Sequence, residues 1–196
     1  IPHISYIQPQ VEHVKNREMS CEAFLDFVVS KTDIKPDYMN NPVELEKIDS
    51  MLAEVKNDTT ITIREISVIG YASPEGSFLF NRQLSEGRAK ALVNYLLTHF
   101  SFSKELYKVE YGGENWDGLR KMVAESDMME KEDILHIIDN TPAAINYHTN
   151  TSRKKSLMLY KHGEPYRYML NEYYPHLRKA ICKIKYNVQN FNIEQA

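Results

Sequence analysis

The chain has 196 residues with 42% hydrophobic and 26% charged residues, which is ordinary for a globular domain that buries a core. A formal net charge of −3 leaves no basic excess to neutralise a phosphate backbone, so we expect no nucleic-acid partner. The longest near-continuous apolar run, 23–29, is too short for a membrane-spanning segment, and Asp26 interrupts it.

Residues 1–20 are expected to form an N-terminal extension, with a short extended stretch near its start. The chain begins at Ile1 rather than Met, which indicates either a processed N-terminus or a piece of a longer protein. The first clear strand is predicted at 22–29, because alternate residues from Cys21 to Val29 share one apolar face.

A helix is predicted over 42–56 and a second strand over 60–71. Asn41 can cap the helix and Glu44 stands where a capping-box acid belongs. The apolar residues of the strand change phase between Ile63 and Ile66, so we expect a bulge near Arg64 and Glu65.

A long helix follows at 79–100, with an apolar stripe of Phe80, Leu84, Ala91, Leu92 and Tyr95. The third strand, 106–111, is expected to end at Gly112 and Gly113. This βαβαβ order predicts an α/β fold (an α+β sandwich) with its helices on one face of the sheet.

Residues 114–175 differ from the rest and are predicted to be a helical insertion before the final strand. Four short helices are expected, at 116–124, 131–138, 153–160 and 166–173. The last strand is predicted at 179–188, and residues 189–196 are expected to be a polar tail. A domain of residues 21–188 that contains the insertion therefore follows the extension and precedes the tail.

Two features of the insertion have competing interpretations. Tyrosines at 166, 168, 173 and 174 are predicted to pack a helix against the sheet, and the alternative is a contact surface for a carbohydrate or protein. Arg153, Lys154 and Lys155 are predicted to form a solvated helix face.

Cys21 and Cys182 are the two cysteines of the chain, and we predict that they are unbridged. Neither their spacing nor that of the seven histidines matches a metal site, so no metal or cofactor is expected. A serine nucleophile would need a Gly-x-Ser-x-Gly elbow, and the surroundings of Ser73 have the wrong spacing. We therefore predict no catalytic residue and no enzyme.

The most informative segment is 70–89, which joins a strand end, a Gly/Pro turn and a helix. Asn81, Ser85 and Arg88 stand at i, i+4 and i+7 and share one helix stripe. Arg88 also falls near the apolar face between Leu84 and Leu92, and a charge placed there needs a partner.

This segment resembles the signature of the OmpA-like domain, which is a strand, Gly-aromatic-Thr-Asp-x-x-Gly, and then Asn-x-x-Leu-Ser-x-x-Arg-Ala. The matching positions keep the spacing unbroken; they are Gly70, Tyr71, Gly76, Asn81, Leu84, Ser85, Arg88 and Ala89. A weaker resemblance covers 21–111 and resumes at 177–186. The variant Gly-Tyr-Ala-Ser-Pro-Glu-Gly is similar to a subgroup from anaerobic Gram-negative gut and oral bacteria.

The resemblance implies a periplasmic, outer-membrane-associated domain that binds the diaminopimelate residue of peptidoglycan stem peptides non-covalently. In that family an Asp of the loop takes the ligand ammonium, and the helix Arg takes its carboxylate as a fork. The implied ligand-binding residues here are Ser73, Glu75, Gly76, Asn81, Ser85 and Arg88.

Ser73 stands at the position of the family's Asp, and a hydroxyl cannot offset an ammonium charge. Glu75 is a candidate substitute, and its alternative role is to pair with Arg88. On the basis of the resemblance, the chain is predicted to tether an envelope protein to the cell wall. The alternative is an adhesion or fimbria-assembly platform with a vestigial ligand site and an envelope-protein partner.

Overall fold

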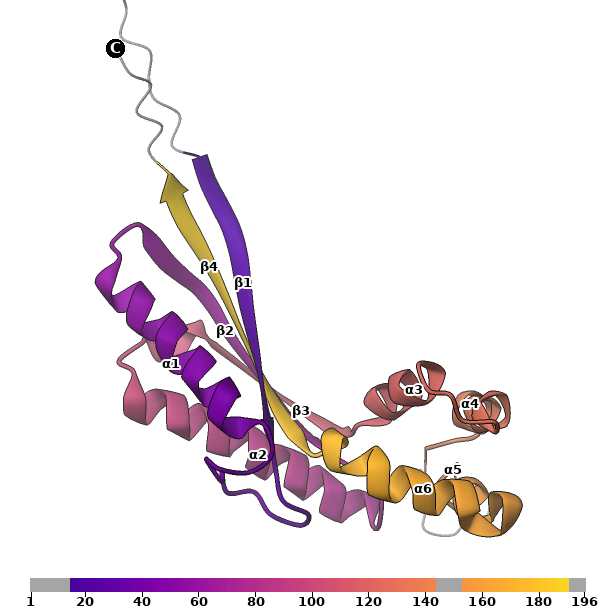
Figure 1. Cartoon of the computed structure of the whole chain (residues 1–196). Coiled ribbons are helices and arrows are strands. Elements are labelled where there is room, and N and C mark those ends of the chain that lie inside the picture. Colours follow the sequence, from indigo (N-terminus) through magenta and orange to yellow (C-terminus); the bar gives the residue numbers. More distant parts are fainter. Residues whose placement is uncertain (1–14, 144–152, 191–196) are drawn as a thin grey trace, which may run out of the picture.

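The computed structural model describes residues 15–143 and 153–190 (Figure 1). Four strands form one sheet in the order β1-β4-β2-β3; they are β1 (Lys15–Asp26), β2 (Ile61–Ala72), β3 (Tyr107–Glu114) and β4 (Lys179–Asn190). Strand β4 is antiparallel to both of its neighbours, and β2 and β3 are parallel. The prediction that the four strands share one sheet is confirmed, although β1 reaches back into the segment assigned to the N-terminal extension.

Helices α1 (Asn41–Asn57) and α2 (Phe78–His99) lie on the same face of this sheet (Figure 1). Leu52 of α1 and Leu92 of α2 pack in an apolar core with the inward residues of the strands, which include Leu25, Ile66 and Cys182. The opposite face carries cross-strand ion pairs such as Lys183–Glu22 and Lys185–Glu65. The predicted α/β class, with helices on one face, is confirmed.

The expected bulge lies in β2, where its register against β4 shifts between Ile63 and Glu65. The extra residue changes the phase of the strand, so Ile63 and Ile66 both point into the core. An uninterrupted strand would have sent one of these two side chains to solvent.

Helix α1 does not begin with the predicted capping box. Its N-cap is Asn40, whose side chain makes no cap hydrogen bond. The Asn41 side chain instead accepts from the Asp26 amide at 2.7 Å and donates to the Asp26 and Lys35 carbonyls at 2.9 Å each. Glu44 accepts from the Phe24 amide of β1 at 3.0 Å. These two side chains connect the start of the helix to the edge strand β1, and Glu44 also accepts from the Asn40 side chain at 3.3 Å.

Strand β3 does not stop at the glycine pair. It continues through Gly112, where a Cβ atom would lie 2.3 Å from the Tyr71 ring, and through Gly113, whose φ is +64°. The glycines therefore let the strand pass a neighbouring aromatic ring. As a result Glu114, the last residue of β3, reaches the end of β2.

The apolar stripe predicted for α2 is wrong at its start, because Phe80 is 45% exposed. The buried stripe begins instead with polar residues, and it consists of Asn81, Leu84, Ser85, Arg88, Ala89, Leu92 and Leu96. The first half of α2 thus faces polar loops, and its second half faces the core.

The insertion contains helices at the four predicted places; they are α3 (Trp116–Ala124), α4 (Lys131–Asn140), α5 (Arg153–Leu159) and α6 (Glu164–Glu172). They lie beyond one end of the sheet (Figure 1) and share a second hydrophobic core. Tyr174 is fully buried in that core and meets Tyr166 edge to face, with 5.9 Å between the ring centroids. The prediction that the tyrosines pack against the sheet is therefore wrong.

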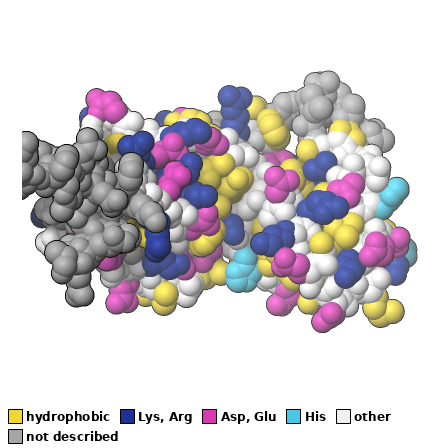
Figure 2. Space-filling view, turned by 90° about the horizontal axis from the view of Figure 1, so that it is seen from above, with side chains coloured by type: hydrophobic (Ala, Val, Ile, Leu, Met, Phe, Trp, Pro, Cys, Tyr) yellow, Lys and Arg dark blue, Asp and Glu magenta, His cyan; other side chains and the backbone are white. Residues whose placement is uncertain are grey.

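Acidic and basic side chains are interspersed over the face of the molecule shown in Figure 2. Over the described ranges, no helix combines the length and the apolar character needed to cross a bilayer.

The two cysteines face the core from adjacent strands and are unbridged, as predicted. Cys182 is opposite Ala23 and Cys21 is opposite Ile184, so the two residues are diagonal neighbours. Burial raises the pKa of the Cys182 thiol to about 12.

Cys182 is expected to resist alkylation by iodoacetamide in the native protein at pH 8. A pKa of about 12 leaves roughly one thiol in 10,000 as the reactive thiolate at that pH, and the residue is 1% exposed. Peptide mass spectrometry should find Cys182 unmodified in buffer and fully modified in guanidinium chloride. Rapid modification in buffer would show that this part of the core opens.

Candidate ligand site

The candidate site begins in the turn between β2 and α2. Strand β2 ends at Ala72, and the Ser77 hydroxyl caps α2 by accepting from the Phe80 amide at 3.3 Å. Gly76 makes the turn possible with a φ of +74°, a conformation that costs a glycine little. The turn therefore positions residues 73–76 over the first turns of α2.

A cavity of about 150 Å³ lies between this turn, α2 and the residues next to β1 and β4. Its lining consists of Val29, Ser30, Ser73, Glu75, Gly76, Phe80, Asn81, Leu84, Arg88 and Arg178. Five of the six predicted site residues line it. Ser85 does not, because its hydroxyl donates to the Arg82 carbonyl of its own helix at 2.9 Å.

Arg88 is fully buried, and its guanidinium donates to three backbone carbonyls. Its Nε reaches the Lys31 carbonyl at 3.0 Å, and its terminal nitrogens reach those of Tyr71 at 3.0 Å and Val28 at 3.3 Å. The side chain therefore joins the turn after β1 to the end of β2. The predicted alternative that Glu75 consumes these donors is wrong, because backbone carbonyls take that place.

Glu75 pairs with a different arginine. The Arg178 terminal nitrogen lies 2.6 Å from the Glu75 carboxylate, and Arg178 Nε donates to the Ser73 hydroxyl at 3.2 Å. That hydroxyl in turn donates to Glu75 at 3.0 Å. Ser73 thus bridges an ion pair in the place where the family has its Asp.

The insertion contacts the turn through a buried ion pair between Lys154 of α5 and Glu114 of β3. Lys154 also donates to the Gly76 carbonyl at 2.9 Å, and Glu114 accepts from the Asn81 amide at 2.7 Å. The Lys154 side chain is only 13% exposed, so the predicted solvated face is wrong at this residue. Helix α5 therefore links the turn to the end of β3.

Sequence reasoning did not identify Arg178, Glu114 or Lys154 as members of the site. Arg178 precedes β4 within 177–186, where the weaker resemblance to the OmpA-like domain resumes, and that resemblance is the available signal. Lys154 carried no signal, because its approach to Gly76 depends on the packing of the insertion over 78 residues of chain.

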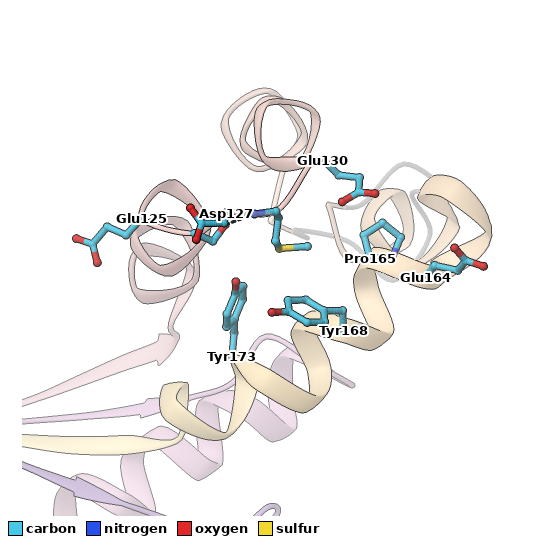
Figure 3. Close-up of a pocket in the computed structure, with 9 residues that line it drawn as sticks. Glu125, Asp127, Glu130, Glu164, Pro165, Tyr168 and Tyr173 are labelled. Atoms are coloured by element: carbon cyan, nitrogen blue, oxygen red, sulfur yellow. Dashed lines mark hydrogen bonds between the residues drawn. The ribbon is translucent and has the colours of Figure 1, made fainter.

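Another cavity, of about 570 Å³, lies within the insertion (Figure 3). The hydroxyls of Tyr168 and Tyr173 face its interior, with their ring centroids 5.6 Å apart. The carboxylates of Glu125 and Glu164 point away from it in Figure 3. No group of three or more metal-binding side chains occurs within residues 15–143 and 153–190.

No family model matches the chain, but it is similar to known proteins in fold and in sequence. The fold is similar to the OmpA-like domain of FopA1 from Francisella tularensis. That superposition covers 91% of this chain and 81% of the other, with 11% identity and a TM-score of 0.43.

The sequence is similar to outer membrane protein 41 of Porphyromonas gingivalis, with 30% identity over 122 residues. The match covers 57% of this chain and 30% of that protein. The chain thus corresponds to less than a third of the length of this relative.

Proposed function

We propose that the chain is a non-enzymatic, OmpA-like domain of the cell envelope that binds a peptidoglycan stem peptide and tethers an outer-membrane-associated protein to the wall. The observation that carries this proposal is the cavity between Arg88 and Arg178. Guanidinium groups form strong, charge-assisted hydrogen bonds with carboxylates, and stem peptides carry free carboxylates.

The burial of Arg88 favours an anionic ligand. Desolvation, and next the positive charge of Arg178, lower the pKa of Arg88 to about 10. Two cations that face one cavity repel each other, and an anion between them would relieve that repulsion. The N-terminus of α2 lies beside the same cavity and adds positive dipole character.

The lining of the cavity gives no sign of a nucleophile. It contains no histidine or cysteine that could activate the hydroxyl of Ser30 or Ser73, and the Ser73 hydroxyl is engaged by Arg178 and Glu75. The similarity to an outer membrane protein supports a location in the periplasm, next to the outer membrane.

Sedimentation with purified peptidoglycan tests the proposal. The wild-type chain should pellet with the sacculi, and Arg178→Gln should weaken the affinity, measured over a series of peptidoglycan concentrations, by about tenfold, which corresponds to the loss of one charge-assisted contact. Arg120→Gln is the matched control, because Arg120 pairs with Asp139 on the exposed surface of the insertion. Failure of the wild type to sediment would contradict peptidoglycan binding.

The alternative function is an adhesion or assembly platform, and one observation favours it. Three consecutive residues at the start of α2, Phe78, Leu79 and Phe80, expose large apolar side chains beside the cavity. Exposed apolar groups of this kind occur at protein interfaces. A wild-type chain that stays in solution with peptidoglycan but captures an envelope protein would support this alternative.

A further inference from the structure

Of the two arginines of the cavity, Arg178 still has hydrogen-bond donors that a ligand can reach. A guanidinium has five N–H groups. Arg88 uses three of them on carbonyls, and Arg178 uses its Nε and one terminal nitrogen on Ser73 and Glu75. The remaining N–H groups have no acceptor among the residues that the structure describes. The Arg178 side chain lines the cavity and is 10% exposed, so a ligand there can accept from it, whereas Arg88 is 0% exposed and contributes its positive charge without an N–H group that a ligand can reach.

The charges of the lining residues do not form a clamp for a zwitterion. Arg88 and Arg178 contribute two positive charges, and Glu75 contributes one negative charge. Arg178 and Ser73 both bond to Oε1 of Glu75, so the charge of Arg178 offsets that carboxylate and the lining keeps a net positive charge, which disfavours an ammonium group. An ammonium placed in the cavity would meet two guanidinium groups and one neutralised carboxylate.

The turn also has a fixed shape, which argues against release of Glu75 from Arg178 when a ligand binds. Asn81 donates to the Glu75 carbonyl at 2.7 Å, and Lys154 holds the neighbouring Gly76 carbonyl at 2.9 Å. Helix α2 and the insertion thus restrain the backbone on both sides of the glutamate, so the ion pair belongs to the resting structure of the site.

From this arrangement we infer that the cavity recognises a carboxylate alone, and that Arg178 removes the requirement for an adjacent ammonium. The inference rests on the proposed function and narrows its ligand class. The site accepts a peptide carboxylate whose neighbouring amine is acylated or absent. A cavity of about 150 Å³ has room for such a group.

Titration of the wild-type chain with three small ligands, followed by amide NMR shifts, tests the inference. The ligands are diaminopimelate, its di-N-acetyl derivative and its diamide. We expect the acetylated compound to bind within about twofold of the parent or more tightly, and the diamide to bind at least about tenfold more weakly. A tenfold loss on acetylation would overturn the inference, and so would the absence of binding by all three compounds.

Glu75→Gln provides a second test that keeps the hydrogen-bond acceptor for Ser73 and Arg178. If Glu75 takes no part in ammonium binding, this variant binds diaminopimelate at least as tightly as the wild type. If Glu75 grips the ammonium, the variant loses about tenfold in affinity for diaminopimelate and retains its affinity for the acetylated form. That second result would overturn the inference.

The inference and the proposed function fail in different ways. If the wild type sediments with peptidoglycan but binds only ligands with a free amine, the proposed function stands and the inference is overturned. Binding of the acetylated ligand without sedimentation would keep the carboxylate site and exclude peptidoglycan as its source.

Discussion

Replacement of Arg88 by alanine is expected to lower the free energy of unfolding by at least about 3 kcal/mol. The substitution removes the donors to the carbonyls of Val28, Lys31 and Tyr71, and a carbonyl that is left without a partner and shielded from water costs about 1–3 kcal/mol. It also leaves a void where a fully buried side chain stood. Urea denaturation followed by circular dichroism measures the loss.

Arg88→Lys is the matched variant for this prediction. It keeps the positive charge but offers one ammonium in place of a fork, so it cannot reach three carbonyls that surround a planar guanidinium. We expect a loss between those of the wild type and the alanine variant. A loss below about 1 kcal/mol for Arg88→Ala would show that the three hydrogen bonds are not needed for the fold.

This structural role changes how the site should be tested. A variant at Arg88 that fails to bind peptidoglycan is uninformative when it is also unfolded. Arg178 engages a serine hydroxyl and a carboxylate instead of backbone carbonyls, so its replacement disturbs the fold less. For that reason the binding experiments depend on Arg178 and Glu75.

The order of the helices and strands could be predicted from local sequence patterns. Period-two and helical spacing placed the four strands and the six helices, because each of these elements buries one face against the rest of the chain. The bulge in β2 was predictable for the same reason, since a change of phase in a buried strand requires an extra residue.

The errors occur where tertiary contacts outweigh a local signal. Asn41 has the sequence position of a helix cap, but its amide pairs with the backbone of β1. Phe80 has the spacing of a core residue, but the start of α2 extends past the core and faces polar loops. In both cases the local spacing is overruled by how the helix is placed against the rest of the fold.

The candidate site was predictable in part. The spacing of Asn81 and Arg88 on one helix stripe indicated a polar site at the start of α2, and both residues line the cavity. The partner of Glu75 was not predictable, because Arg178 is 103 residues away and reaches the turn only after β4 has joined the sheet. Whether Glu75 pairs with Arg88 or with Arg178 depends on that long-range contact.

Gly70→Ala is expected to destabilise the fold by about 3 kcal/mol or to prevent folding. A Cβ atom at this position would lie 2.1 Å from the Ser85 carbonyl oxygen and 2.6 Å from the Ala89 amide nitrogen. Both are backbone atoms of α2, so a change of rotamer cannot relieve the clash, and the helix itself must move away from β2. Urea denaturation measures the loss of stability.

Gly76→Ala is the matched control, because it also removes a glycine and restricts the unfolded chain to a similar degree. A Cβ at Gly76 meets nothing within 4 Å, and its cost is limited to the φ of +74°, about 1–2 kcal/mol. The control should therefore fold and lose less stability than Gly70→Ala, and equal losses would contradict the packing argument. Since a shift of α2 also moves Arg88 away from the Tyr71 carbonyl, a Gly70→Ala chain that does fold should have lost its carboxylate affinity as well.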